Sequence, residues 1–373
     1  MIKPSICLVA HFAYGAISGG RSGHVGGVER QTSLMAKWLV ERGYRVSLVT
    51  WAENGDVDEE IDGVHVIKTC RQDSGIPILR FFYPRWSSLN TALKRANADV
   101  YYQNCGEYVT GQVALWCRSH NRKFVYSLAS DMDADPELPV MKTMRERVLY
   151  KYGLSHADCV IAQTQAQRKM LEDGFGISSR VLPMPCAGPK VNEDISALKK
   201  ESMNILWAGR IQPLKRLELL LEVAELLPEV EFYVAGNADG DDSYTAPLLS
   251  KMEELSNVFY LGMVSRERMP KLYQNATLLC CTSEYEGFPN TFLEAWSFGV
   301  PVVSTFDPDN MLDSLNLGVS IKNKQSLYDA IKKLSQSQGE WEKMSEDSRQ
   351  YYLKNHSVDS AMARFAEVFE EVI

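Results

Sequence analysis

The stretch Thr277-Leu-Leu-Cys-Cys-Thr-Ser-Glu-Tyr-Glu286-Gly-Phe-Pro-Asn-Thr-Phe-Leu-Glu294-Ala-Trp-Ser-Phe-Gly299 joins two patterns that decide the class of fold. Its first six residues are mostly apolar or β-branched and predict a buried strand. Pro289 then breaks the chain, Asn290 is expected to cap a helix over residues 291–298, and the glycine ends that helix. A strand that passes through a polar loop into a helix is the repeating unit of a parallel α/β sheet.

The same unit recurs along the chain on both sides of this stretch. Short apolar runs rich in Val and Ile predict strands at 6–10, 45–51, 64–68, 100–102, 124–127 and 159–162, and again at 204–208, 231–235, 258–261, 276–282, 300–304 and 318–321. Helical patterns fall between them, at 28–42, 87–97, 107–120, 138–154, 164–174 and 217–227, and the tail after residue 326 is helical. Strands buried on both faces and separated by helices predict parallel sheets with right-handed crossovers.

The chain is long enough for two domains, and its alternation of strands and helices is interrupted once. Residues 181–200 hold three prolines, a mixed charge run and weak periodicity, which is typical of a linker. We therefore expect two doubly wound α/β domains, over residues 1–184 and 185–356. Ligands of such sheets bind beyond the carboxyl ends of the strands, and two of them face to face make a cleft that suits two substrates.

Composition narrows the class of protein. The net charge of −8 at pH 7 argues against a nucleic-acid binder by bulk electrostatics. The first 185 residues carry a small excess of Lys and Arg, which suits anionic substrates or a lipid surface, or reflects only the solvated faces of two different domains. The eight cysteines form no C-x-x-C pair, and several lie in apolar runs, a pattern typical of buried thiols in a reducing cytosol.

No run approaches the roughly 18 apolar residues of a membrane span, and the N-terminal apolar run is too short for a signal peptide. We expect a cytoplasmic protein, with peripheral contact to the inner face of a membrane left open. The segment Arg80-Phe-Phe-Tyr-Pro-Arg85-Trp86 mixes aromatic and cationic side chains, which suits a membrane interface or a lipid acceptor. Core packing of the aromatic rings with solvated arginines explains the segment equally well.

The loop and helix at 282–294 carry the chemistry of a candidate site. A helix N-terminus presents unpaired amides and the positive end of a dipole, which suits a phosphate. Glu294 lies about one turn inside the helix, where its carboxylate can accept hydrogen bonds from sugar hydroxyls, and Glu286 lies in the loop outside. Two carboxylates beside such a terminus indicate a nucleotide sugar, although a lone Glu294 would be explained by the preference of acids for a first turn.

Two further stretches offer groups for phosphate. The segment Gly209-Arg210-Ile-Gln-Pro-Leu-Lys215 follows a predicted strand, and its two cations lie near a helix start, where they would neutralise a diphosphate. The segment His24-Val-Gly26-Gly27 follows the first strand and opens a helix, so its backbone can approach a ligand closely. A glycine pair alone is a weak signal.

Together these elements resemble the large family of retaining GT-B glycosyltransferases known as family 4. The E-x7-E element from Glu286 to Glu294, the G-R-x-x-x-x-K segment, the glycine pair and Tyr260-Leu-Gly262-Met263-Val264 occur in the order of that family. The resemblance covers nearly the whole chain and is strongest over 204–304. It implies an α/β GT-B fold of two Rossmann-like domains, with the last helix, residues 357–373, packing back on the first domain.

The resemblance implies a hexosyl-type transferase that moves a sugar from a nucleotide sugar, UDP- first and GDP- next, to a glycan or lipid-linked acceptor in bacterial-type polysaccharide or glycoconjugate biosynthesis. Glu294 would bind the ribose hydroxyls, Glu286 the donor sugar, and Arg210 with Lys215 the diphosphate. The diphosphate would leave from the face that the acceptor attacks, so that no protein nucleophile and no metal cofactor is required. The residues implied to bind the donor are Gly27, Gly209, Arg210, Lys215, Met263, Val264, Glu286, Gly287, Phe288, Pro289, Asn290, Thr291 and Glu294.

The sequence departs from the family on the acceptor side. Many relatives carry a His after the fourth or fifth strand of the first domain, whereas this chain has Ala129-Ser130-Asp131-Met-Asp133. Asp131 fits the acidic position of the family and would be catalytic together with Glu286, Arg210 and Lys215. The candidate acceptor-side residues are His24, Gly26 and Ser130.

Several alternatives stay open beside this interpretation. Asp131 and Asp133 form a D-x-D pair that suits Mg²⁺ or Mn²⁺, a minor alternative to structural or acceptor roles. Relatives commonly carry a Gly-Gly pair after the strand at 300–304, where this chain has Phe306-Asp-Pro-Asp-Asn. His11, at the end of the first strand, either reaches the binding edge or is satisfied within its own turn.

Two other functions compete with transfer. The missing His leaves room for a non-catalytic GT-B scaffold that binds a nucleotide or a partner. A Rossmann oxidoreductase is disfavoured, because no G-x-G-x-x-G with the required spacing directly follows the first strand.

Overall fold

The computed structural model describes residues 3–20, 26–53, 55–189, 202–238 and 242–373. The chain divides into two compact units. Unit 1 is formed by Met1–Pro185 together with Val358–Ile373, and unit 2 by Cys186–Ser357. The predicted linker falls largely on residues outside the described ranges. No helix in those ranges is long and apolar enough to cross a bilayer.

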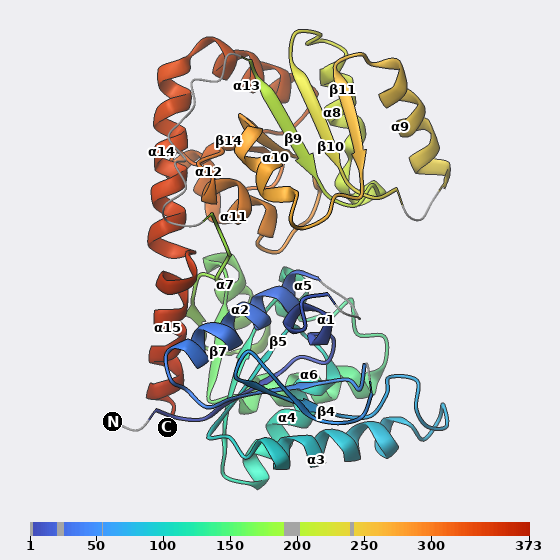
Figure 1. Ribbon diagram of the computed structural model, residues 1–373, viewed down its shortest axis with the longest axis vertical. Helices are drawn as coiled ribbons and strands as arrows, with labels where there is room; N and C mark the ends of the chain where they lie inside the picture. The colour runs from blue at the N-terminus through green and yellow to red at the C-terminus, as the bar shows by residue number, and fades with distance from the viewer. Residues whose placement is uncertain (1–2, 21–25, 54, 190–201, 239–241) are drawn as a thin grey trace. The chain divides into compact units, whose positions relative to one another are not determined.

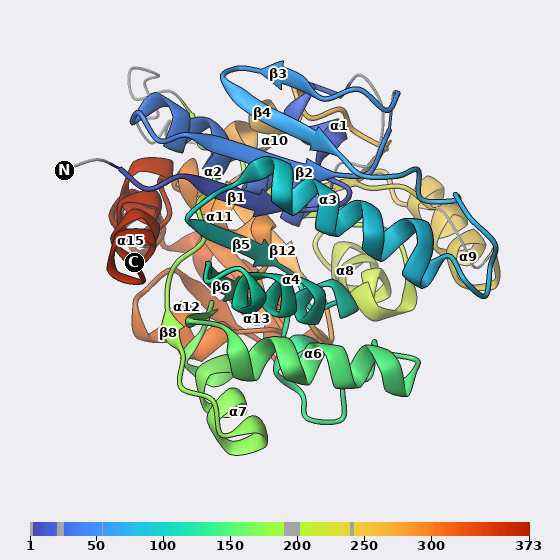
Figure 2. The same cartoon turned by 90° about the horizontal axis from the view of Figure 1, so that it is seen from below.

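Unit 1 is built on a sheet whose strands, within the described ranges, follow the order β3-β4-β2-β1-β5-β6-β7-β8. Figure 2 shows this succession from β3 and β4 through β2 and β1 to β5. Every neighbouring pair is parallel except β3 and β4. The carboxyl ends of the parallel strands therefore meet at one edge, where ligands of such sheets bind. The strands are β1 Ile6–Val9, β2 Val46–Thr50, β3 Glu59–Ile61, β4 Val64–Lys68, β5 Val100–Asn104, β6 Lys123–Ser127, β7 Cys159–Ala162 and β8 Arg180–Val181.

Both faces of the unit 1 sheet are covered by helices. Successive side chains of a strand point to opposite faces, so Ile6 and Leu8 pack with α1, α2 and α15, whereas Cys7 and Val9 pack with α3, α4, α6 and α7. This double burial explains why the strands are apolar at nearly every position. The helices are α1 Tyr14–Ile17, α2 Gly27–Glu41, η1 Phe81–Trp86, α3 Ser87–Ala96, α4 Tyr108–Ser119, α5 Asp131–Ala134, α6 Met144–His156, α7 Gln165–Phe175 and α15 Val358–Glu371.

Two parts of unit 1 differ from the sequence prediction. The strand β3 was not predicted and runs antiparallel to β4, because Asp62 and Gly63 have φ angles of 50° and 77° and form a tight hairpin turn. The helix predicted at 138–154 begins at Met144 instead. Thr143 accepts a hydrogen bond from the amide of Glu146, whose carboxylate accepts one from the Thr143 amide in return, and this capping box fixes the start.

Unit 2 is built on a second, fully parallel sheet. Its strands, in the part of the chain that the structure covers, follow the order β11-β10-β9-β12-β13-β14. Figure 1 shows β9, β10 and β11 side by side in this order. The strand order reverses its direction between β9 and β12, inside the sheet. Such a reversal is the usual place for a ligand site in a doubly wound sheet. The strands are β9 Asn204–Ala208, β10 Glu231–Ala235, β11 Val258–Gly262, β12 Leu278–Cys281, β13 Val302–Ser304 and β14 Gly318–Ser320.

The unit 2 sheet is also covered on both faces. Ile205 and Trp207 pack with α8, α9 and α13, whereas Leu206 packs with α10, α11 and α12. The predicted α/β class with two parallel sheets is confirmed by this arrangement. The helices are η2 Pro213–Lys215, α8 Leu217–Ala224, α9 Asp242–Glu254, α10 Met269–Asn275, α11 Asn290–Ser297, η3 Pro308–Asn310, α12 Met311–Ser314, α13 Lys324–Gln336 and α14 Gln338–Asn355.

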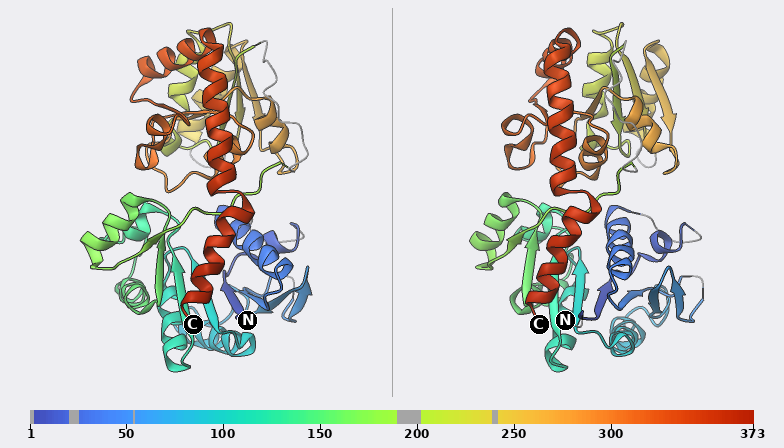
Figure 3. Two further views of the ribbon diagram at one scale, coloured as in Figure 1. Left: turned by 90° about the vertical axis from the view of Figure 1, so that its left-hand side faces the viewer. Right: turned by 60° about the vertical axis from the view of Figure 1, so that its left-hand side comes forward.

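The last helix, α15, packs on unit 1. Figure 3 shows it lying between α2 and β7 of that unit. Its buried Met362, Phe365 and Phe369 belong to the same core as β1 and α2, and both phenylalanine rings meet Tyr102 of β5 edge to face. At its first turn Asp359 accepts a hydrogen bond of 2.7 Å from the Trp38 ring nitrogen. The chain terminus is thus part of the unit 1 core.

Candidate active site

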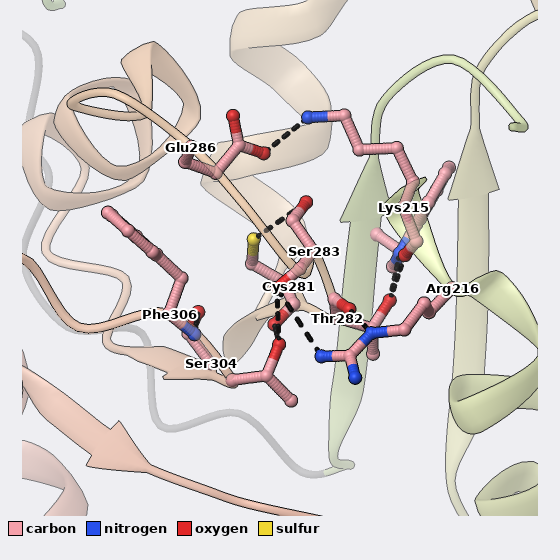
Figure 4. Close-up of polar contacts among 10 residues, drawn as sticks. Lys215, Arg216, Cys281, Thr282, Ser283, Glu286, Ser304 and Phe306 are labelled. Carbon is pink, nitrogen blue, oxygen red and sulfur yellow. Dashed lines mark hydrogen bonds and ion pairs between the residues drawn. The ribbon is translucent and has the colours of Figure 1, made fainter. Parts of the chain in front are cut away.

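The loops that follow β9 and β12 lie together at the carboxyl edge of the unit 2 sheet. Thr282 ties them: its hydroxyl donates to the Lys215 carbonyl (2.5 Å) and accepts from the Trp207 ring nitrogen (3.1 Å). The Arg216 guanidinium donates to the Thr282 carbonyl (2.9 Å), and the Glu284 amide donates to the Leu214 carbonyl (2.9 Å). Figure 4 shows the contacts of Thr282 with Lys215 and Arg216. Hydrogen bonds therefore join the predicted motif at 209–215 to the predicted motif at 282–294.

Lys215 and Glu286 form an ion pair across these loops, with the Lys215 ammonium donating to Glu286 Oε1 (Figure 4). About a fifth of each side chain is exposed, 21% for the lysine and 18% for the glutamate. Arg216 has a left-handed backbone (φ 45°), which turns the chain from η2 into α8 and leaves Lys215 at the edge. Two predicted catalytic residues from distant motifs are thus brought into contact.

Glu294 is held by two side chains from the neighbouring segment around α10. The buried Tyr273 hydroxyl donates to Glu294 Oε2 (2.7 Å), and the Arg266 guanidinium donates to Oε1 (3.0 Å). Burial, and then the Glu294 carboxylate, raises the pKa of Tyr273 well above its ordinary value, so that the tyrosine stays a hydroxyl donor. Sequence reasoning missed both partners, since no local pattern relates residues 266 and 273 to Glu294.

The helix α11 starts one residue earlier than predicted. Asn290 is its first residue and Pro289 occupies the capping position without a side-chain cap, so the expectation that Asn290 caps the helix is wrong. Proline carries no amide and has a fixed φ, which suits the entry to a helix. The Phe288 ring packs against Trp296 and His356 at centroid distances of 6.3 and 5.3 Å. This packing fixes the first turn, in which the Phe292 amide donates to the Pro289 carbonyl at 3.0 Å.

The edge around Gly209 is lined by backbone and by the Trp207 ring. The Gly209 amide donates to the Ala235 carbonyl (3.0 Å), and a Cβ at position 236 would stand 1.8 Å from the Gly209 carbonyl oxygen. Only glycine therefore fits at 236 without movement of the backbone. Arg210 follows and is exposed, and neither a hydrogen bond nor an ion pair joins its side chain to another described residue. Its guanidinium is available to an anion at this edge.

The segment after β11 forms the side of a pocket of about 400 Å³. Val264 lines the pocket, whereas Met263 is 79% exposed beside it. The pocket walls are Leu261, Val264, Glu267, Arg268, Lys271, Leu272 and Asn275. Arg266 of the same segment contacts Glu294 but does not line this pocket.

The loop after β13 replaces the Gly-Gly pair of the family with an aspartate-closed turn. The Asp307 carboxylate accepts from the Leu312 amide at 3.0 Å, and the backbone of Asp309 and Asn310 is left-handed. The Thr305 hydroxyl donates to the Ser283 carbonyl (2.7 Å), which joins this loop to the one after β12. Figure 4 shows Phe306 next to Ser304, with Arg216 on the opposite side of Thr282.

The remaining predicted residues belong to unit 1. Gly26 is the extended residue before α2, and Gly27 is the first residue of that helix. Ser130 caps α5, and Asp131 Oδ1 accepts a hydrogen bond of 2.9 Å from the Gln167 amide group. His24 lies outside the described residues.

Asp133, the second carboxylate of the D-x-D pair, is buried and serves the backbone. It accepts hydrogen bonds from the amides of Ala129 (2.7 Å) and Ser130 (3.1 Å), and also from the amide of Gly106. Burial raises the pKa of Asp133, and these amides oppose the rise. Among the described residues, no group of three or more His, Cys, Asp or Glu side chains is placed to hold a metal ion.

Family models match both parts of the chain. The model described as "Glycosyl transferase 4-like domain" matches residues 26–187. The model described as "Glycosyl transferases group 1" matches residues 190–351. Together the two matches cover most of the sequence.

Curated relatives match over shorter stretches. An uncharacterized glycosyltransferase of Methanocaldococcus jannaschii is 26% identical over 172 residues, which are 42% of this chain and 41% of the relative. A D-inositol 3-phosphate glycosyltransferase of Mycobacterium sp. (strain KMS) is 37% identical over 105 residues, which are 27% of this chain and 24% of the relative. The chain therefore matches less than half the length of these relatives.

Solved structures match over the full length. Sucrose-phosphate synthase from Thermosynechococcus elongatus superposes with a TM-score of 0.77 at 18% identity, over 99% of each chain. HepE of Anabaena, in complex with UDP and glucose, superposes with a TM-score of 0.74 at 18% identity, over 98% of this chain and 99% of its own. At this identity the likeness shows the fold, and with the two family models it establishes that the chain belongs to the group 1, family 4 type of glycosyltransferases, which are transferase enzymes with the GT-B fold.

Proposed function

We propose that this glycosyltransferase moves a sugar from a nucleotide sugar to a glycan or lipid-linked acceptor, with retention of configuration at the transferred carbon. The observation that carries the proposal is the Lys215–Glu286 ion pair at the carboxyl edge of the unit 2 sheet. Glu286 lies four residues before the start of α11. A cation, a hydroxyl-binding acid and helix amides at one edge are the groups that a sugar joined to a nucleoside diphosphate requires.

In the proposed reaction, the bond between the anomeric carbon and the diphosphate oxygen breaks, and an acceptor hydroxyl oxygen bonds to that carbon from the same face. The hydroxyl proton passes to the departing diphosphate, so no protein nucleophile takes part. Arg210 and Lys215 stabilise the negative charge that grows on the diphosphate. Glu286 holds a hydroxyl of the donor sugar, and Glu294, positioned by Tyr273, binds the ribose hydroxyls.

UDP-sugars are the first donors that we propose, and GDP-sugars the next. The solved structure of HepE, which shares the fold, holds UDP and glucose. The pocket of about 400 Å³ beside Val264 supports a nucleobase at that end, with Met263 at its border. Donor contacts by Gly27 and by the backbone of 287–291 complete this proposal.

On the acceptor side we propose that Asp131 orients the attacking hydroxyl and supports the charge that develops at the sugar. The Gln167 amide group fixes one Asp131 oxygen, which limits the rotation of that carboxylate. Gly26 and Ser130 lie at the starts of helices α2 and α5. The proposed reaction requires no metal cofactor, and transfer that continues in excess chelator is the result that we expect.

The donor proposal is tested by the thermal stabilisation of the purified protein in a panel of UDP-, GDP- and ADP-sugars, since a bound donor raises the melting temperature by mass action. We expect a shift with one nucleotide and its loss in Glu294→Ala. If no nucleotide sugar is bound or consumed and Glu294→Ala changes nothing, the donor proposal is wrong. Measured sugar transfer would end the alternative of a non-catalytic scaffold.

We also propose peripheral contact between unit 1 and an anionic membrane surface. Large apolar side chains are exposed on two segments, and we call them, with Arg80 and Arg145, the basic apolar patch. The Arg145 guanidinium lies 3.8 Å from the centroid of the Phe81 ring, which places the start of α6 against η1 and joins the two segments. Apolar side chains beside cations suit an interface with anionic lipid. The apolar members are Ile76, Ile78, Leu79, Phe82, Tyr83, Val140, Met144 and Val148, each 48–84% exposed.

Vesicle sedimentation tests the basic apolar patch. We expect the protein to pellet with phosphatidylglycerol vesicles, to remain soluble with phosphatidylcholine vesicles, and to be released by high salt. The double variant Ile78→Ser, Phe82→Ser should lose this binding. Val57→Ser, at an equally exposed apolar side chain (80%) elsewhere on unit 1, is the control. Wild-type protein that does not pellet with anionic vesicles would refute the contact.

A further inference from the structure

Unit 1 contains a pocket of about 380 Å³ that none of the donor residues lines. Its walls come from residues just after β1, β2 and β5, from η1, and from the segment before α6. The volume falls in the range of about 300–1,000 Å³ that is usual for small-molecule sites. The side chains that matter for its chemistry are His11, Trp51, Arg85, Glu107, Tyr108 and Lys142.

Three of the lining side chains carry a buried nitrogen with no hydrogen-bond partner among the described residues: His11 Nε2, Trp51 Nε1 and Arg85 Nε. His11 is only 8% exposed and Trp51 only 4%. A buried donor without a partner costs about 1–3 kcal/mol, and folded proteins contain few of them. Three such nitrogens around one pocket indicate a polar ligand whose oxygens supply their missing hydrogen-bond partners.

The unpartnered groups are held in place by their neighbours. The His11 and Trp51 rings stack with centroids 4.0 Å apart, and the Arg85 guanidinium lies 5.9 Å from the centroid of the Trp51 ring. Arg85 also donates to the Gln72 carbonyl at 2.6 Å, through Nη2 and not through Nε. Burial, and then Arg85, lowers the pKa of His11 to about 4, so a ligand meets a neutral imidazole. The site is therefore preorganised.

Charged side chains of both signs line the pocket. Arg85 and Lys142 supply two cations, and Glu107 and Glu146 supply two carboxyl groups. Burial, followed by the nearby Asp133 and Glu29, raises the pKa of Glu107 to about 7, so near neutral pH this group both accepts and donates. Because Glu107 is only partly ionised near neutral pH, the lining carries a small net positive charge, which disfavours an amine. Aromatic rings beside a mixture of donors and acceptors suit a neutral ring with apolar faces and a rim of hydroxyls.

We infer that this pocket binds a saccharide ring of the acceptor, with Trp51 and Arg85 donating hydrogen bonds to its oxygens and Glu107 accepting one from a hydroxyl. The inference rests on the proposed function, since glycosyl transfer is what requires a second saccharide on this chain. It names binding residues that the sequence motifs do not contain. Tyr108, on the same wall as Glu107, supplies an aromatic ring for the apolar face.

Saturation-transfer NMR with methyl α-glycosides of glucose, mannose and N-acetylglucosamine tests the pocket. Wild type should bind at least one glycoside. Trp51→Phe, which keeps a ring but removes the N–H, and Arg85→Lys should each weaken this binding about fivefold or more, as expected for the loss of one buried hydrogen bond. Trp116→Phe and Arg122→Lys are matched controls, because both lie in unit 1 and neither lines the pocket.

A thermal shift with UDP on the same samples separates this inference from the donor proposal. Trp51→Phe and Arg85→Lys should keep the UDP shift of wild type. Glycoside binding that is absent in wild type, or unchanged in both variants, overturns the saccharide pocket and leaves the donor proposal standing if UDP still binds. Competition by inorganic phosphate for the glycoside would also overturn it, since the pocket would then select an anion. Glycoside binding without any nucleotide binding would keep the pocket and end the donor proposal.

Discussion

The Lys215 ammonium pairs with the Glu286 carboxylate at the edge of the unit 2 sheet, and in our proposal the same ammonium binds the diphosphate. Lys215→Ala should weaken UDP binding about tenfold to a hundredfold, because a hydrogen bond to a charged group is worth about 1.5–3 kcal/mol. Isothermal titration measures this loss. Lys251→Ala, which breaks an exposed pair with Glu225 in the same unit, should leave UDP affinity unchanged. Equal affinities in the two variants would remove Lys215 from the donor site.

Tyr273 acts on the donor through Glu294, as a positioning residue. Tyr273→Phe leaves Glu294 Oε2 without its buried donor. We expect UDP affinity to fall about threefold to tenfold, and unfolding free energy to fall by about 1 kcal/mol, the net value of one hydrogen bond. Titration and urea denaturation measure the two effects. Tyr328→Phe is the control, because the Tyr328 hydroxyl accepts a hydrogen bond only from the exposed Lys332 within the described part of the chain. A loss of stability without a loss of affinity would mean that Tyr273 is structural only.

Glu107 gives unit 1 a dependence of stability on pH. Its pKa rises from 4.5 to about 7 on folding, so the folded chain binds this proton more tightly than the unfolded chain. The stabilisation by the protonated group is complete below pH 4.5 and is lost as the pH rises through 7. Glu107→Gln stays neutral, so its stability relative to wild type should increase between about pH 5 and about pH 8. Urea denaturation at the two pH values checks the sign, and a difference that does not change with pH would contradict it.

At the scale of elements, the close approach of β9 and β10 limits the residue at 236. Gly236→Ala places a Cβ 1.8 Å from the Gly209 carbonyl oxygen, so one strand end must move. We expect a loss of roughly 3 kcal/mol in unfolding free energy, at the upper end of single substitutions. Gly339→Ala in α14 meets nothing within 4 Å and should instead gain about 0.5–1 kcal/mol. Thermal unfolding of both variants tests this, and equal melting temperatures would contradict it.

The strands could be predicted well because both faces of each sheet are covered. Val64–Lys68, Cys159–Ala162, Asn204–Ala208 and Glu231–Ala235 have the bounds that the apolar runs indicate. The short β3 was missed because its half-buried Glu59–Ile61 segment has little apolar signal, although the Asp-Gly turn that follows is a hairpin signal. Helix starts were less certain, because a capping side chain fixes them more than periodicity does.

The site could be predicted only as far as motifs reach. Lys215, Glu286 and Glu294 stand at fixed spacings in short segments, so a sequence can indicate them. Tyr273 and Arg266 contact Glu294 only because α10 packs beside α11, and no spacing encodes that contact. The same reason hides the pocket around Trp51 and Arg85, whose residues come from six separate segments.

At the scale of the whole molecule, unit 1 takes its core from two segments that unit 2 separates in the sequence. Phe365 of α15 is fully buried against Tyr102. Phe365→Ala should cost about 3–5 kcal/mol in the stability of unit 1, as large core truncations do. Phe259→Ala, at a side chain 39% exposed, should cost much less. Calorimetry with and without UDP tests this, because nucleotide binding to unit 2 should survive Phe365→Ala. Equal losses in both variants would contradict the burial argument.

The placement of α15 has a consequence for biosynthesis. The strands of unit 1 leave the ribosome before unit 2, yet one face of their sheet stays uncovered until residues 358–373 follow unit 2. Unit 2 is encoded entirely between these parts and can complete its core before unit 1 does. The nascent chain therefore carries an uncovered apolar sheet face, around Ile6, Leu8 and Tyr102, through the synthesis of all of unit 2. Such a face is where a chaperone would bind this protein during translation.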